Sequence, residues 1–140
     1  MKILLAVDGS PISTRAAKHA ARLVTRLADP AQLILFNADP PMLQAVAVKV
    51  GLETVQRHHA ENGQHAIRAA RTVLKRAHVD FSERLAVGEP AEAIVKAAKA
   101  ERCDLIVMGT HGQGGLQRLL LGSVASKVIA LTDLPVTVVR

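Results

Sequence analysis

The sequence is poor in aromatic residues and in cysteine. It contains two Phe and no Trp or Tyr among its 140 residues. Proteins that bind single-stranded nucleic acid without sequence preference stack bases on aromatic side chains, so this composition argues against that class. The one cysteine, Cys103, permits no internal disulfide, which favours a reducing compartment, and we expect a cytoplasmic protein.

Long hydrophobic runs are also missing. No apolar run reaches the ~18 residues of a membrane span, and Asp8 interrupts the apolar start of the chain. We therefore expect neither a membrane segment nor a signal peptide. Hydrophobic residues still make up 49% of the chain, which is typical of a folded protein, and the length favours one domain over residues 1–140.

Acidic residues are outnumbered, with 12 Asp and Glu against 18 Lys and Arg, which gives a formal charge of +6. Such an excess can indicate a polyanionic partner. The basic residues are nevertheless spread over several predicted helices, as on an ordinary solvated surface. We expect neither a nucleic acid nor a membrane partner.

Short apolar runs alternate with longer segments of helical periodicity. One long helical stretch, from Met42 to His78, contains Gly51 and Gly63, where we expect a kink or a loose N-terminal part. The apolar runs are typical of buried parallel strands. The predicted strands are Lys2–Val7, Gln32–Ala38, Val79–Gly88, Cys103–Gly109 and Leu134–Arg140.

This alternation predicts an α/β fold, a three-layer αβα sandwich of the Rossmann-like kind. We expect a five-stranded parallel sheet in the order 3-2-1-4-5, joined by right-handed crossovers. Ligands of such folds bind beyond the carboxyl ends of the strands, where the strand order reverses. The segments Val7-Asp8-Gly9 and Met108-Gly109-Thr110 end the two strands at that point.

A glycine-rich segment, GTHGQGGLQRLLLGSVA, follows the fourth predicted strand from Gly109 to Ala125. Glycine lets backbone N–H groups approach an anion closely, and the helix that opens at Gly122-Ser123 offers unpaired donors that suit phosphate. The alternative is a flexible surface loop with a capping glycine. The chain has no Gly-Lys-Ser/Thr, and neither this loop nor the first strand–helix turn has the G-x-G-x-x-G spacing, so it carries neither a Walker A loop nor a Rossmann fingerprint.

The glycines instead follow the pattern G-x2-G-x9-G-S, at Gly109, Gly112, Gly122 and Ser123. Together with LLAVDGS, LILFNA and GEPAEAIVKAA, this pattern resembles the ATP-binding branch of the universal stress protein family along essentially the whole chain. The resemblance implies a homodimeric α/β domain that binds ATP, with Mg²⁺ as a candidate counter-ion of the phosphates.

The resemblance also implies which residues contact the nucleotide. Ala6 and Asp8 match positions near adenine and ribose, and the backbone of Ala38 matches a contact with the adenine edge. The positions that match ribose and phosphate contacts are Met108, Gly109, Gly112, Gly122, Ser123 and Val124, and His111 could touch a phosphate when protonated. Asp8 has an alternative role in its Asp-Gly turn, and His111 and Arg118 have one as solvated surface residues.

His58, Glu61 and His65 share one face of the long helical stretch, at a spacing that could hold a metal ion. A solvated polar face is the interpretation we favour. We expect no metal site and no catalytic residue.

The resemblance thus favours an ATP-binding stress-response protein, a regulatory module that acts through a homodimer and an unidentified protein partner. It implies that the C-terminal strand pairs across the dimer axis. A slow ATPase and a nucleotide-free scaffold remain as alternatives, as do AMP or cyclic AMP as the ligand and a tetramer as the assembly.

Overall fold

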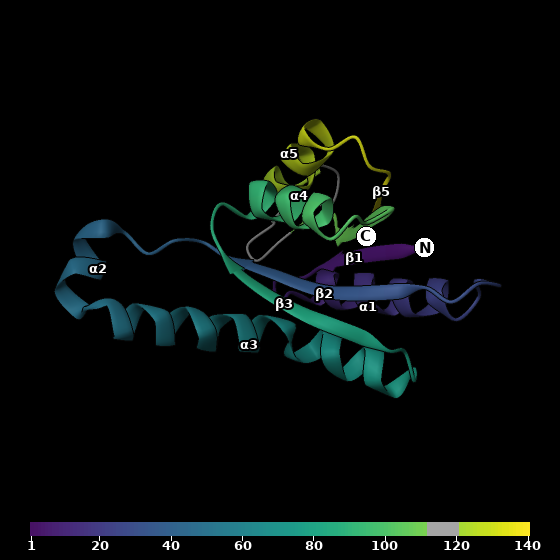
Figure 1. Ribbon diagram of the computed structural model, residues 1–140, viewed down its shortest axis with the longest axis horizontal. Coiled ribbons are helices and arrows are strands. Elements are labelled where there is room, and N and C mark those ends of the chain that lie inside the picture. Colours follow the sequence, from purple (N-terminus) through teal and green to yellow (C-terminus); the bar gives the residue numbers. More distant parts are fainter. Residues whose placement is uncertain (112–120) are drawn as a thin grey trace.

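The computed structural model spans residues 1–140, and the structure describes residues 1–111 and 121–140. One sheet lies between two layers of helices, with α4 and α5 above it and α1 and α3 below it in the view of Figure 1. This arrangement confirms the predicted three-layer α/β fold.

The sheet has the order β3-β2-β1-β4-β5, as predicted, and every pair of neighbouring strands is parallel. Ile3 at the centre pairs with Leu33 on one side and with Leu105 on the other. The strands are β1 (Lys2–Ala6), β2 (Gln32–Asp39), β3 (Phe81–Val87), β4 (Leu105–Gly109) and β5 (Val136–Val139). Since the order reverses beside β1, the carboxyl ends of β1 and β4 flank the natural ligand crevice.

Each face of the sheet has its own apolar core. The helices are α1 (Pro11–Val24), α2 (Gln44–Val50), α3 (Leu52–Arg76), α4 (Pro90–Ala100) and α5 (Ser123–Leu131). On one face, Ile3 and Leu5 pack among α1 and α3 residues such as Ala17 and Ile67. On the other, Leu4, Ile34 and Ile106 pack against α4 and α5. Alternate residues of the central strands are buried on opposite faces, which explains their continuous apolar sequence.

The predicted long helical stretch is two helices. Gly51 separates α2 from α3 with a φ of 83°, a conformation that glycine adopts without strain. Gly63 leaves α3 unbroken and lies against Leu85 of β3, whose Cδ1 would be 3.0 Å from an added Cβ. The expected break is therefore present at one glycine only.

Helix α2 and the first turns of α3 project beyond the sheet (Figure 1). Apolar side chains there remain open to solvent, with Leu43 77% and Val48 78% exposed. No helix in residues 1–111 and 121–140 is long and apolar enough to cross a membrane.

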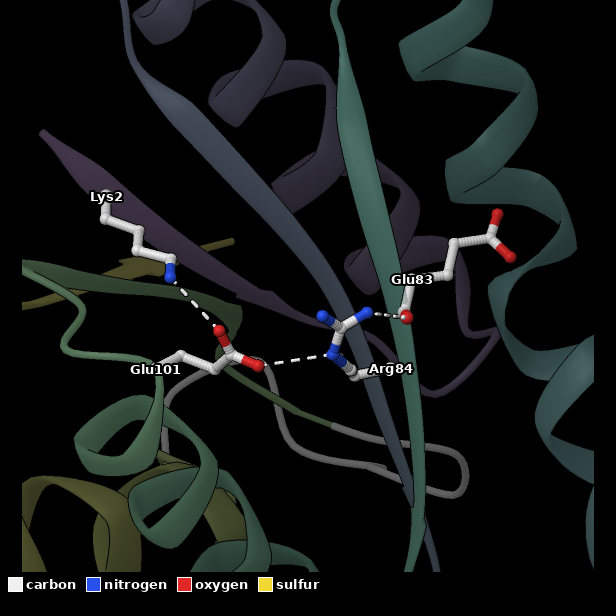
Figure 2. Close-up of polar contacts among 4 residues, drawn as sticks. All are labelled: Lys2, Glu83, Arg84 and Glu101. Carbon is white, nitrogen blue, oxygen red and sulfur yellow. Dashed lines mark hydrogen bonds and ion pairs between the residues drawn. The ribbon is translucent and has the colours of Figure 1, made fainter.

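A charged network ties β1, β3 and the end of α4 together. Figure 2 shows the Glu101 carboxylate between the Lys2 ammonium and the Arg84 guanidinium, at 3.0 Å and 3.2 Å. Hydrogen bonds from Lys2, and then from Arg84, hold the pKa of Glu101 below its usual range. Close by, Cys103 is buried in the α4–α5 core, and this burial raises the pKa of its thiol.

Candidate functional site

A cleft of about 670 Å³ opens at the carboxyl ends of β1, β2 and β4. It extends from the start of α5 to the middle of α3, and Ser123 and Asn62 line its two ends. Ligand clefts of α/β proteins occur at this place, and the volume is in the range of small-molecule sites.

Nine of the ten residues predicted to contact a nucleotide line this one cleft. They are Ala6, Asp8, Ala38, Met108, Gly109, His111, Gly122, Ser123 and Val124. The tenth, Gly112, lies outside the described residues, as does Arg118. Their convergence from three strands and a helix start makes the cleft the candidate functional site, while the contact of each residue with a ligand stays a prediction.

Asp8 lines the cleft and also shapes the turn after β1. Its Oδ1 accepts a hydrogen bond from the Ser10 backbone N–H at 3.0 Å, and Gly9 has a φ of 83°. Ser10 then caps α1, because its hydroxyl accepts from the Ser13 N–H at 3.1 Å. Both roles weighed for Asp8, in the turn and at the cleft, are therefore compatible with its position.

Two glycines of the G-x2-G-x9-G-S pattern stand at close backbone approaches. A Cβ on Gly109 would lie 2.7 Å from Cγ2 of Ile12, and a Cβ on Gly122 would lie 2.7 Å from the Thr110 carbonyl oxygen. The Gly122 N–H donates to that same carbonyl at 2.7 Å. These glycines bring α1 against β4 and the start of α5 against the end of β4, so part of the pattern serves the architecture of the cleft.

Helix α5 begins at the cleft with an uncapped N-terminus. Gly122 is its N-cap, and no side chain among the described residues caps it. Ser123, Val124 and Ala125 form the first turn and line the cleft. The N–H groups of a first turn have no partner inside the helix, and together with the helix dipole they favour an anion.

His111 lies at the same end of the cleft. It is half-buried, and its Nδ1 shares a hydrogen bond with the Thr110 hydroxyl at 3.0 Å. The ring thus borders the cleft instead of standing free on the surface.

Sequence reasoning missed the polar residues at the other end of the cleft. Asn37 is buried, and its Nδ2 donates to the Val7 carbonyl at 2.8 Å, which joins the ends of β2 and β1. Asn62 of α3 also lines the cleft, as does His65, which was considered only as a metal ligand. Asn37 interrupts the apolar run of β2 as a polar residue, and that was the available signal.

A side-chain cluster that we call the Asp39 clasp comprises Asp39, His59 and Asn62. Oδ2 of Asp39 accepts from Nδ1 of His59 at 2.5 Å and from Nδ2 of Asn62 at 3.1 Å. Since a carboxylate only accepts, Nδ1 of His59 carries the proton. The clasp fixes the end of β2 against α3 at the edge of the cleft.

The three residues weighed as metal ligands do not converge. His65 lines the cleft, and Nε2 of His58 is 3.1 Å from Nδ2 of Asn62. No group of three His, Cys, Asp or Glu side chains that could hold a metal ion occurs in the part of the chain that the structure describes.

Comparison with known proteins gives consistent matches. The sequence matches the universal stress protein family over residues 1–140. It is 34% identical over 139 residues to the universal stress protein MJ0531 of Methanocaldococcus jannaschii, a match that covers 99% of this chain and 81% of that protein.

Two solved structures share the fold along nearly the whole chain. MJ0577, a universal stress protein of the same organism, superposes with a TM-score of 0.82 at 29% identity, covering 99% of this chain and 94% of that one. A universal stress protein solved in complex with cAMP superposes with a TM-score of 0.74 at 28% identity, covering 100% and 97%. From the family match over residues 1–140, the MJ0531 relationship and this shared fold, we conclude that the chain belongs to the universal stress protein family.

Proposed function

We propose that the cleft binds an adenine nucleotide, with ATP as the expected ligand. The uncapped N-terminus of α5, at Gly122 and Ser123 on the cleft wall, is the observation that carries this proposal. Phosphate is the anion that such a helix start suits best. The related protein solved in complex with cAMP, at 28% identity, supports the choice of an adenine nucleotide.

The charges along the cleft give the nucleotide a direction. Asp8, after β1, and Asp39, at the end of β2, both line the cleft, and their carboxylates would repel phosphates. The phosphates therefore belong at α5 and the nucleoside toward β2 and α3. In this orientation the Asp8 carboxylate would accept a hydrogen bond from a ribose hydroxyl. Mg²⁺, if it accompanies ATP, would be held mainly by the phosphate oxygens.

We propose binding as the function, with regulation through the nucleotide state. Rapid phosphoryl transfer needs cationic charge on the γ-phosphate. Among the described residues that line the cleft there is no lysine or arginine. We expect ATP hydrolysis to be slow at most and unaltered in the Asp8→Ala variant.

We further propose a homodimer that pairs β5 with β5 and changes its contacts with an unidentified protein partner when the nucleotide is lost. β5 is the edge strand next to β4, and its outer side is unpaired within the described residues. An open apolar edge favours pairing with a second strand. We also propose that residues 1–140 act as one domain. We propose a cytoplasmic location, which fractionation of expressing cells would test.

The first experiment is mass spectrometry of the small molecules that acid denaturation releases from freshly purified protein. We expect an adenine nucleotide in near-stoichiometric amount. The emptied protein should melt at a higher temperature with added ATP, because a ligand that binds only the folded state stabilises it. A protein that releases no nucleotide, and whose melting temperature does not change when ATP, AMP or cAMP is added, would contradict the proposal.

A further inference from the structure

The Asp39 clasp places a carboxylate with one occupied oxygen at the nucleoside end of the cleft. Oδ2 accepts from both His59 and Asn62, which uses its two lone pairs. No described residue donates to Oδ1. The Asp39 side chain is 16% exposed and that of His59 is 10% exposed, so the carboxylate is held in a largely enclosed position yet remains accessible from one side.

The clasp removes the rotational freedom that a surface aspartate would have. His59 and Asn62 come from successive turns of α3, and the Asp39 carbonyl is fixed from the other side by the Gly88 N–H at 2.9 Å. A polar group that is oriented before the ligand arrives discriminates well between ligands, because a mismatched ligand leaves it buried and unpaired.

We propose that Asp39 is a specificity-determining residue, whose Oδ1 accepts a hydrogen bond from the exocyclic amine of the base and thereby selects adenine. His59 and Asn62 are its positioning residues. The inference rests on the proposed nucleotide binding and on the direction argued above. A keto oxygen at the same place on the base would face the carboxylate and be repelled.

The same geometry argues against guanine. An aspartate that recognises guanine offers both of its oxygens to the neighbouring N–H groups of that base. Here Oδ2 is occupied by His59 and Asn62, so only Oδ1 is left to accept from a ligand. One acceptor matches the single amine of adenine, whereas guanine presents two neighbouring donors, of which one would stay unpaired.

The test compares ATP with inosine triphosphate, which carries a keto oxygen where ATP carries the amine. Dissociation constants are measured by titration calorimetry on nucleotide-free protein. We expect the unsubstituted protein to bind ATP about ten-fold or more tightly than inosine triphosphate, as for a hydrogen bond to a charged group. GTP should bind about as weakly as inosine triphosphate.

The decisive variant is Asp39→Asn. Its side-chain oxygen can still accept from His59 and Asn62, which leaves its NH₂ group where Oδ1 was. The NH₂ group repels an amine and donates to a keto oxygen, so we expect weaker ATP binding, tighter binding of inosine triphosphate and a reversed preference. An equal loss for both nucleotides would show a merely structural role and would overturn the inference.

Glu61→Gln is the matched control. Glu61 is exposed on the same helix and is not among the cleft residues. Its substitution removes the same negative charge as Asp39→Asn does. Its preference for ATP should equal that of the unsubstituted protein, and a reversed preference in this control would overturn the inference by making the effect one of net charge.

A second measurement needs no substitution. Purine riboside triphosphate lacks any group at the amine position, and the unsubstituted protein should bind it about ten-fold more weakly than ATP. Equal binding of these two nucleotides would overturn the role of Asp39 even if Asp39→Asn failed to fold. If no nucleotide binds at all, the proposed function itself fails, which is a distinct outcome.

Discussion

Gly122 shows how much one hydrogen atom in place of a side chain matters at the cleft. Its N–H bonds the Thr110 carbonyl oxygen, and an added Cβ would stand 2.7 Å from that oxygen and 3.2 Å from Cα of His111. Both neighbours are backbone atoms, which cannot move aside as the end of a flexible side chain can. The start of α5 must therefore shift if any other residue replaces this glycine.

We expect Gly122→Ala to destabilise the fold by about 1–3 kcal/mol, as overpacking of a tight site does, and to weaken nucleotide binding. Thermal melts and ATP titration measure the two effects. Gly88→Ala is the control, since its added Cβ would meet only Cβ of Ala93 at 3.8 Å. Equal melting temperatures for the two variants would contradict the close approach at Gly122.

The residues of the cleft were predictable only where they belong to a sequence pattern. Asp8, Gly109, Gly122 and Ser123 stand in such a pattern, and the structure brings them together. In the Asp39 clasp, His59 and Asn62 lie 20 and 23 positions after Asp39 in the sequence, so the cluster exists only because α3 packs on β2. No local periodicity contains that information, so no sequence signal singles out His59.

At the scale of the elements, the starts of two strands were predicted too early in the chain. The prediction for the third strand began at Val79, whereas β3 begins at Phe81, and the fifth was predicted from Leu134, whereas β5 begins at Val136. Apolar character begins before the strand does, because Val79 is buried in the core without being in the sheet. Burial and strand pairing are separate properties, and hydrophobicity reports only the first.

An ion pair joins α3 to the edge strand β3. Nε of Arg71 lies 2.6 Å from Oε1 of Glu83, and a second hydrogen bond runs from Nη2 to Oε2 at 2.9 Å. The Arg71 hydrogen bond lowers the pKa of Glu83 below its usual value. A carboxyl whose pKa is lower in the folded state stabilises the fold above the unfolded pKa, about 4.3, and loses that effect as pH falls through the folded value.

We expect Arg71→Met to lower the free energy of unfolding at pH 7 by at most about 1 kcal/mol, the range of partly exposed ion pairs. The difference from the unsubstituted protein should shrink as pH falls below about 4.3, and thermal melts between pH 7 and pH 3 would follow it. Arg68→Met removes a cation from the same helix that has no ion pair within the described residues. A difference that persists unchanged at pH 3 would contradict the role of Glu83.

At the scale of the whole molecule, the proposed dimer depends on which backbone groups of β5 face outward. The carbonyls of Pro135 and Val139 accept from the N–H groups of Ile106 in β4 and of Thr110 directly after it. Backbone groups of alternate residues point the same way along a strand, so Thr137 also faces β4 while Val136 and Val138 face the open edge.

This alternation makes a matched pair of proline substitutions informative. Val138→Pro removes an outward N–H and should convert the dimer to monomers, which sedimentation velocity would detect. Thr137→Pro removes an N–H that faces β4 and should mainly lower the melting temperature. If Val138→Pro sediments as the unsubstituted protein does, pairing through this edge is wrong.

The overall topology was the most predictable level. Continuous apolar strands such as KILLA, separated by helices, have few arrangements that satisfy right-handed crossovers, and the structure adopts the expected one. The projection of α2 was not predictable, because the break at Gly51 says where a helix ends and nothing about the direction of the next one.

The burial of Cys103 has a practical consequence for following the molecule in solution. As the chain's one cysteine, it lies 5% exposed within the α4–α5 core, and its raised pKa keeps it in the unreactive thiol form. Alkylation must then wait for an opening of that core, so the labelling rate reports the opening equilibrium. We expect labelling roughly 1,000-fold slower in buffer than in denaturant, and equal rates would show that the α4–α5 layer opens freely. The alkylation rate of the Cys103 sulfur thus measures the stability of the core under α4 and α5 without any introduced label site.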